Sequence, residues 1–315
     1  MSQRNVLFVM DPINSIKPYK DSTLAMMLEC QRRGHQLWYA EPQNLYLQDG
    51  VPFAAMQQAR VFDDNDHWYE LSAANDTALA RMDAILMRKD PPFDMDFVYC
   101  TYLLEAAERQ GCLVVNRPSS LRDMNEKLTA TWFPQCMTPS LVTSAATRIR
   151  EFVASQEHVV LKPLDGMGGT GIFQVHKGDA NLNSIIETLT QDGQELIMAQ
   201  RYIPEITAGD KRILMVNGIP APYALARIPP ADDFRGNIAR GGRGEGVELS
   251  ERDRWICDQV APELVKHGIL FAGLDVIGDY LTEVNVTSPT CIRELDHAFG
   301  LNIAADLFTA IEARW

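Results

Sequence analysis

Residues 161–171 read LKPLDGMGGTG and place four glycines within six positions, directly after an apolar stretch. Glycines let backbone amides approach a polyphosphate closely, and Lys162 can supply positive charge there. The spacing of these glycines also matches the dinucleotide-binding motif G-x-G-x-x-G, but that motif needs a following helix. Residues 172–175 read IFQV and indicate a strand instead, and no Gly-Lys-Ser/Thr follows to complete a Walker A motif. A plain glycine turn in a hairpin is the competing interpretation.

Apolar segments in adjacent pairs surround this run and indicate antiparallel sheets. The pairs are 158–161 with 172–175, 212–216 with 222–226, and 273–277 with 281–286. Asn217-Gly218 lies within the middle pair and is typical of a type I′ turn, because both turn positions need positive φ. Residues 228–246 are rich in Gly, Pro, Asp and Arg, and they predict a long mobile loop. Loops of that length are uncommon unless they have a function.

The first third of the chain alternates strand-like and helix-like segments. Strands are expected at 6–10, 36–40, 84–87 and 112–115, and helices at 22–33 and 97–110. This βα rhythm predicts a parallel sheet covered by helices. One helix over 121–133 is expected to lead into a second module. The fold class is therefore α/β with α+β modules, divided into domains 1–122, 123–200 and 201–315, with a mobile loop at 228–243.

Composition limits the possible functions. The chain has 315 residues, 46% of them hydrophobic, and a formal net charge of -13, which argues against nucleic-acid binding. The first ten residues contain only one short apolar run, so neither export nor a membrane span is expected. Six cysteines lie far apart, without the close pairs of zinc or redox motifs. Reduced thiols in a cytoplasmic protein are the simplest interpretation.

Oxygen ligands cluster in the last strand pair. Glu283 and Asn285 share one face of a strand because they are two residues apart. Asp275 would face Glu283 if a three-residue turn, 278–280, joins the strands, whereas a two-residue turn would point it the other way. Such oxygens suit Mg²⁺. A solvated polar face is the alternative, though the apolar residues interleaved with the three donors indicate a core-facing row.

Basic residues form a third set. Arg212 and Arg227 lie in apolar strand segments, where a guanidinium requires an anion such as carboxylate or phosphate. Arg235, Arg240 and Arg243 lie in the predicted loop, which could close over a reacting centre and exclude water. For an isolated arginine, a solvated partner of a surface carboxylate is the better interpretation.

At this point the sequence resembles the prokaryotic glutathione synthetases, a family of ATP-grasp ligases. The resemblance rests on MRKDPPF at 87–93, KPLDGMGG at 162–169, MAQRYIP at 198–204 and NVTSPTCIRE at 285–294. It extends from about residue 11 to near the C-terminus. It implies an ATP-grasp fold with an N-terminal parallel α/β domain, ATP held between two antiparallel sheets, and Mg²⁺, with Mn²⁺ as an alternative.

The resemblance also implies roles for individual residues. ATP-binding residues are Lys127, Lys162, Asp165, Gly166, Met167, Gly168, Gly169, Gln200, Arg201, Tyr202, Ile203 and Asp210. Metal ligands are Asp275, Glu283 and Asn285. Substrate-binding residues are Arg88, Asn285, Ser288, Thr290 and Arg293. The candidate catalytic residues are Arg212 and Arg227, from their place in apolar strand segments, and Arg235, from its place in the predicted loop.

The implied reaction joins γ-glutamylcysteine to glycine through an acyl phosphate and consumes ATP. Another ATP-grasp ligase, for D-alanine–D-alanine or for amino acids and peptides, is the nearest alternative. A nucleotide-binding regulatory protein without turnover is the alternative from another class. The base rate for oligomers favours a closed, even-numbered assembly, and the resemblance suggests a tetramer.

Overall fold

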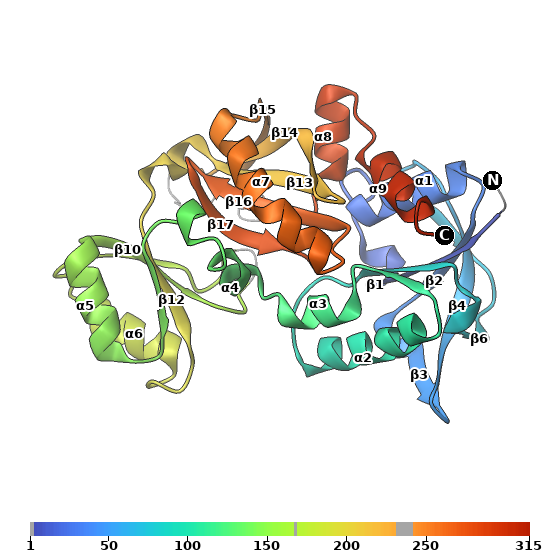
Figure 1. The fold of residues 1–315 in the computed structure, drawn as a ribbon, viewed down its shortest axis with the longest axis horizontal. Coiled ribbons are helices and arrows are strands. Elements are labelled where there is room, and N and C mark those ends of the chain that lie inside the picture. Colours follow the sequence, from blue (N-terminus) through green and yellow to red (C-terminus); the bar gives the residue numbers. More distant parts are fainter. Residues whose placement is uncertain (1–2, 167–168, 231–241) are drawn as a thin grey trace.

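The computed structural model describes residues 3–166, 169–230 and 242–315, which fold around three β-sheets (Figure 1). The first sheet has the order β3-β4-β2-β1-β7-β8, with β5 and β6 also paired to β4. Its strands are β1 (Asn5–Met10), β2 (Gln36–Ala40), β3 (Leu45–Gln48), β4 (Val51–Val61), β5 (Tyr69–Leu71), β6 (Asn75–Ala78), β7 (Ala84–Arg88) and β8 (Leu113–Val115).

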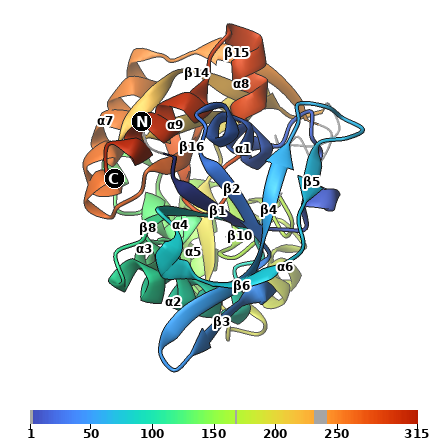
Figure 2. The same ribbon diagram turned by 90° about the vertical axis from the view of Figure 1, so that its right-hand side faces the viewer.

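The predicted parallel sheet is correct for β2, β1, β7 and β8 only. Strand β4 pairs antiparallel with β2 and also with β3, β5 and β6, so residues 45–78 extend the sheet in the opposite sense, as Figure 2 shows. Helices α1 (Ser22–Arg32) and α9 (Ile303–Glu312) pack on one face, and α2 (Met95–Arg109) packs on the other. The core strands are buried on both faces, as parallel strands usually are.

The single helix expected over 121–133 is wrong, because the structure has two short helices there. They are α3 (Pro118–Asp123) and α4 (Glu126–Ala130). Asn125 separates them: its side-chain oxygen accepts hydrogen bonds from the backbone N–H groups of Lys127 and Leu128, each at 3.0 Å. Asparagine at this N-cap position starts a new helix and turns the chain. The new helix brings Glu126 and Lys127 to the candidate site.

The second sheet is antiparallel, with the order β11-β10-β12-β9. Its strands are β9 (Ser140–Thr143), β10 (His158–Pro163), β11 (Phe173–His176) and β12 (Ile197–Arg201). Helices α5 (Ala146–Gln156) and α6 (Leu182–Thr190) cover one face, and this part stands apart from the rest of the chain in Figure 1. Its small core is separate from the other two hydrophobic clusters.

The third sheet is also antiparallel and has the order β15-β14-β13-β16-β17. Its strands are β13 (Asp210–Val216), β14 (Ile219–Ile228), β15 (Arg243–Glu248), β16 (Phe271–Ile277) and β17 (Tyr280–Asn285). Asn217 and Gly218 have φ of 49° and 79°, as the turn prediction requires. The predicted loop over 228–246 is too long, because residues 243–248 form β15. Residues 231–241 lie outside the described part of the chain.

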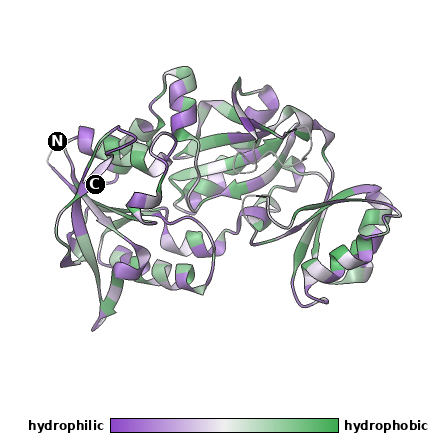
Figure 3. Cartoon of the chain, turned by 180° about the vertical axis from the view of Figure 1, so that it is seen from behind, coloured by the Kyte–Doolittle hydropathy of each residue, from purple (hydrophilic) through white to green (hydrophobic). Residues whose placement is uncertain are grey.

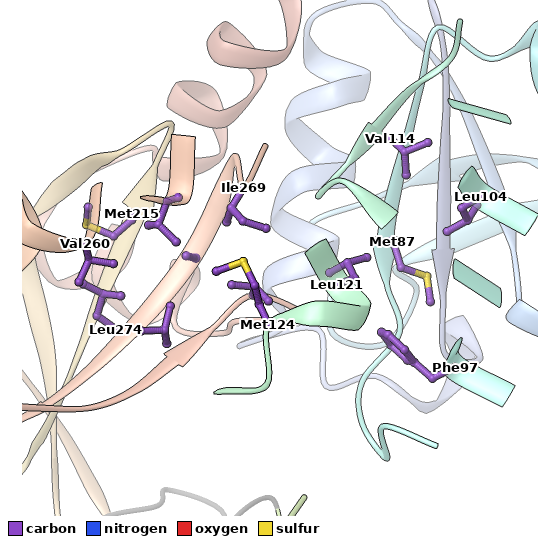
Figure 4. Close-up of a cluster of buried hydrophobic side chains, with 14 of the residues drawn as sticks. Met87, Phe97, Leu104, Val114, Leu121, Met124, Met215, Val260, Ile269 and Leu274 are labelled. Carbon is purple, nitrogen blue, oxygen red and sulfur yellow. The ribbon is translucent and has the colours of Figure 1, made fainter. Parts of the chain in front are cut away.

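The first and third sheets share one core. Met87, Phe97 and Leu104 from the first sheet and its helix connect through Leu121 and Met124 to residues beneath the third sheet (Figure 4). Helices α7 (Glu251–Lys266) and α8 (Ile292–Phe299) complete this body. Apolar residues gather on the inner strands and on the inward sides of the helices (Figure 3). Within the described residues, no helix is long and apolar enough to cross a membrane.

Candidate active site

A cavity of about 730 Å³ lies between the second and third sheets. One wall comes from β10 and β12, and the opposite wall comes from β13, β14, β16 and β17. Residues 15–21 and 287–291 close one end of the cavity. Its volume is within the range of sites for small molecules and cofactors.

The wall from the second sheet follows the alternation of β10. Val160 and Lys162 line the cavity, whereas Val159 and Leu161 point into the small core on the other face. Gln200 of β12 is the cross-strand partner of Val160 of β10 and also lines the cavity. Its amide nitrogen Nε2 is buried and has no hydrogen-bond partner among the described residues. A buried amide without a partner is costly, so this atom suits a ligand with an acceptor, such as a purine.

The opposite wall carries a buried network of ion pairs. Arg212 pairs with Asp275 across β13 and β16, with its second nitrogen 3.0 Å from Oδ2. Arg227 contacts the same carboxylate at 2.9 Å and also pairs with Asp210. Gly273 makes room for this arrangement, because a Cβ there would lie 2.8 Å from Arg212 Cδ. The network confirms that Arg212 and Arg227 sit among anions and lie close together.

Charge balance in the network sets its ionisation. Burial alone would raise the pKa of Asp275, but Arg212 and Arg227 hold that pKa below its usual range. Burial raises the pKa of Asp210 to about 7, and Asp275 adds to this while Arg227 opposes it. Asp210 Oδ1 is buried without a hydrogen-bond partner in the described residues. Asp210 is therefore the carboxyl in this network that a ligand hydroxyl would suit best.

Asp275 faces Glu283, as the metal-site prediction requires, but the expected reason is wrong. The turn contains two residues, since Ile277 pairs with Tyr280. A β-bulge restores the register, because Val276 pairs with Leu281 and Asp275 with Glu283, which leaves Thr282 as the extra residue. The Thr282 hydroxyl donates to the Asp275 carbonyl at 3.1 Å. Asn285 Nδ2 lies 3.3 Å from Asp275 Oδ2, so the three predicted ligands are adjacent.

Lys127 bridges the two walls. Its ammonium donates to the carbonyl of Gly166 at 2.9 Å, lies 3.5 Å from Glu283 Oε1, and pairs with Glu126. Burial disfavours this ammonium, but Glu283 and Glu126 keep its pKa above the usual value. Burial lowers the pKa of the neighbouring Lys162, and Glu283 opposes that shift.

Most of the residues expected to bind ATP surround the cavity. Those that line it are Lys162, Gly166, Gly169, Gln200, Arg201, Tyr202, Ile203 and Asp210. Lys127 is almost fully buried behind them, and Asp165 lines a smaller hollow that shares Glu126 with the main cavity. Met167 and Gly168, like Arg235, lie outside the described residues.

The residues expected to bind the second substrate are only partly together. Asn285, Ser288 and Thr290 line the cavity. Arg88 lies buried behind the 287–291 segment, where it donates to the Pro289 carbonyl at 2.9 Å, and burial lowers its pKa to about 10. Arg293 is not among the residues that line the cavity, and its side chain pairs with Asp63.

Several residues at the cavity were not predicted from the sequence. They include Lys17, Lys20, Asp21, Glu126 and Glu294. Burial and the nearby Glu283 raise the pKa of Glu126 to about 7. Burial also raises the pKa of Asp21 and of Glu294. Asp21 caps α1, since its carboxylate accepts from Leu24 N at 2.6 Å, and this capping signal before residues 22–33 was the one available hint.

Solved structures with the same architecture identify the class. The ATP-grasp ligase PsnB with its minimal precursor superposes with a TM-score of 0.65 at 17% identity, covering 99% of this chain and 100% of that chain. The D-cycloserine synthetase DcsG superposes with a TM-score of 0.68 at 13% identity, covering 99% of this chain and 100% of that chain. Together with two antiparallel sheets around a cavity, these likenesses define an ATP-grasp fold.

Sequence comparison narrows the class. The family model "Prokaryotic glutathione synthetase, N-terminal domain" matches residues 5–122, and "Prokaryotic glutathione synthetase, ATP-grasp domain" matches 126–300. Glutathione synthetase of Pseudomonas aeruginosa is 58% identical over 97% of this chain and 96% of its own length. The glutathione synthetase of Coxiella burnetii is 52% identical over 98% of this chain and 96% of its own length. The chain belongs to the prokaryotic glutathione synthetase family and is an ATP-dependent ligase.

Proposed function

We propose that this enzyme phosphorylates the C-terminal carboxylate of γ-glutamylcysteine with ATP and lets the amine of glycine attack the acyl phosphate. The products are glutathione, ADP and phosphate. The observation that carries this proposal is one cavity with a purine-compatible wall on one side and a dense ionic network on the other. Phosphoryl transfer mainly requires positioning and charge neutralisation, which such a network supplies without a covalent nucleophile.

On the nucleotide side, we assign the adenine to Val160 and the 200–203 segment, and the ribose to Asp210. Lys127, Lys162 and the 165–169 segment would hold the phosphates. The unpartnered Nε2 of Gln200 and Oδ1 of Asp210 support these assignments, because each buried atom lacks the partner that a ligand would supply.

The residues at the cavity also fit Mg²⁺. Asp275, Glu283 and Asn285 are its proposed ligands, with Mn²⁺ as an alternative ion. Among the described residues no three His, Cys, Asp or Glu side chains form a ready-made metal site, so phosphate oxygens would complete the shell. Burial and the nearby Glu283 raise the pKa of Glu126 although Lys127 opposes the shift, which supports a cation there, because the two carboxylates share the single ammonium of Lys127. Bound Mg²⁺ would neutralise charge on the transferred phosphoryl group.

On the acceptor side, Arg212 and Arg227 would stabilise the anionic reacting centre, and Ser288, Thr290 and Asn285 would contact the dipeptide. Arg88 supports their segment from behind through Pro289. Arg293 is proposed from the sequence resemblance alone, and Arg235 from its place in the predicted loop. A closing segment within 228–243 would protect the acyl phosphate from water.

The proposal extends to organisation. Domains 1–122, 123–200 and 201–315 correspond roughly to the three sheets. Six free, buried cysteines suit a reducing cytoplasm. A homotetramer is the proposed assembly, and size-exclusion chromatography with light scattering tests it.

Phosphate release provides the test of function. The enzyme is assayed with ATP, Mg²⁺ and γ-glutamylcysteine plus glycine, and in parallel with D-alanine in place of both substrates. We expect release only in the first assay, together with glutathione detected by mass spectrometry. Release with D-alanine alone would indicate a D-alanine ligase, and no release in either assay would leave a nucleotide-binding protein without turnover.

A further inference from the structure

Three aromatic rings stack at one end of the cavity wall that β10 and β12 form, which is called the nucleotide wall below. His158 at the start of β10 lies between His176 of β11 and Tyr202, which follows β12. Its ring centroid is 3.8 Å from that of His176 and 3.9 Å from that of Tyr202, with interplanar angles of 25° and 23°. The stack is therefore nearly parallel and continuous across three chain segments.

The stack belongs to the cavity-facing side of the sheet. His158, Val160 and Lys162 alternate along β10 on one face, and the last two line the cavity. His176 is the cross-strand partner of His158, and the backbone N–H of Tyr202 donates to the His158 carbonyl at 3.0 Å. Tyr202 itself lines the cavity, whereas His158 and His176 do not. His158 thus holds a cavity residue in place without touching the ligand site.

The contacts of His158 favour its neutral form. The Gln174 amide nitrogen lies 2.6 Å from His158 Nε2, and an amide that donates there needs a ring nitrogen without a proton. Burial lowers the pKa of His158, and His176 lowers it further. Glu157 and Lys177 adjoin the two histidines in sequence, and the Lys177 backbone N–H donates to the Glu157 carbonyl at 2.8 Å.

We propose that His158 is a positioning residue for the nucleotide site, and that protonation of His158 at acidic pH opens the stack, releases Tyr202 and weakens ATP binding. A proton on His158 places a cation 3.8 Å from the centroid of the His176 ring and removes the acceptor for the Gln174 amide. Since the pKa of His158 is lowered, the intact stack is fully present at neutral pH and is lost as the pH falls. The inference rests on the proposed assignment of residues 200–203 to ATP.

Calorimetric titration with the nonhydrolysable analogue AMPPNP and Mg²⁺, without dipeptide or glycine, tests this at pH 7.5 and 5.5. Protonation of the nucleotide also weakens binding, so the comparison is between variants at the same pH. His176→Gln removes the neighbouring imidazole from an exposed position, and His67→Gln removes an exposed histidine that does not line the cavity. Relative to wild type and His67→Gln, we expect the loss of affinity between the two pH values to be about three- to tenfold smaller in His176→Gln.

His176→Lys provides the opposite test, because a permanent cation beside His158 should weaken AMPPNP binding already at pH 7.5. NMR titration supplies a readout independent of binding: the pKa of His158 should rise in His176→Gln. Equal pH dependence in wild type and His176→Gln, or an unchanged His158 pKa, would overturn the proposal. No AMPPNP binding by wild type at either pH would instead refute the nucleotide site itself.

Discussion

The two walls of the cavity differ in how they are built. The wall from the second sheet presents Val160 and Gln200 together with the cations of Lys162 and Arg201, and its far face rests on a small separate core. The wall from the third sheet presents interlocked arginines and carboxylates, and its far face joins the large core shared with the N-terminal sheet. The first wall suits recognition of a base and its phosphates, and the ionic wall suits phosphoryl transfer.

The difference shows which of the two walls has to be held rigidly. Buried ions need fixed partners, because a charge without one is costly in an apolar interior. Strands β13 and β16, which carry part of this network, are anchored in the larger body through buried residues such as Met215 and Leu274 (Figure 4). The following predictions test this contrast by removing groups from one wall at a time.

The largest effect is expected for Asp275→Asn in the ionic wall. Loss of this carboxylate leaves Arg212 and Arg227 without their shared partner, so the free energy of unfolding should fall by about 3–5 kcal/mol. Urea unfolding in EDTA without nucleotide measures it. Glu245→Gln breaks the exposed Arg243–Glu245 pair of the same sheet and should cost less than about 1 kcal/mol. Similar losses in both variants would contradict the view that buried partners anchor this wall.

Glu283→Gln should affect chemistry more than stability. A neutral amide weakens the proposed metal site, so phosphate release should fall by at least about a hundredfold at ordinary Mg²⁺. Glu248→Gln, an exposed change on β15, is the control and should retain activity. Near-normal turnover of Glu283→Gln would refute the metal assignment, provided that its melting temperature is unchanged.

Arg88→Ala should separate the two substrates. Without Arg88 the Pro289 carbonyl loses a charge-assisted hydrogen bond, so KM for γ-glutamylcysteine should rise about tenfold while KM for ATP changes less than about twofold. Steady-state kinetics with each substrate varied in turn measures this, and Arg81→Ala at an exposed position is the control. Equal increases for both substrates would show that Arg88 acts on general stability.

The sequence predicted regular features well and local irregularities poorly. Alternation along β10 and the pairing of β13 with β14 follow from periodicity and the Asn217-Gly218 turn. The bulge at Thr282 has no periodic signal, yet it decides that Asp275 faces Glu283. The break at Asn125 is a local capping effect, and it determines where Glu126 lies. Long-range packing, which buries Arg88 behind Pro289, is not encoded in any local pattern.

A smaller effect is expected for Glu126→Gln. The pKa of Glu126 is raised to about 7, so the wild-type residue carries its proton at pH 5 and buries a carboxylate beside Glu283 at pH 8. The stabilising contribution of protonated Glu126 to the fold is therefore present at low pH and is lost as the pH rises through 7. In EDTA, the variant should gain melting temperature over wild type at pH 8 but not at pH 5, by about 2–4 °C. Glu151→Gln, exposed on α5, should show no such difference.

The smallest effect separates the two faces of the nucleotide wall. Val160 and Val159 are neighbours on β10, but Val160 lines the cavity and Val159 is fully buried in the small core. Val160→Ala should weaken ATP binding by about two- to fivefold, because it removes apolar contact with the base, and should leave stability nearly unchanged. Val159→Ala should do the reverse, lowering the free energy of unfolding by about 1–3 kcal/mol with ATP affinity retained. Calorimetry and urea unfolding on the same preparations measure both, and loss of ATP affinity in Val159→Ala alone would reverse the assignment of the faces.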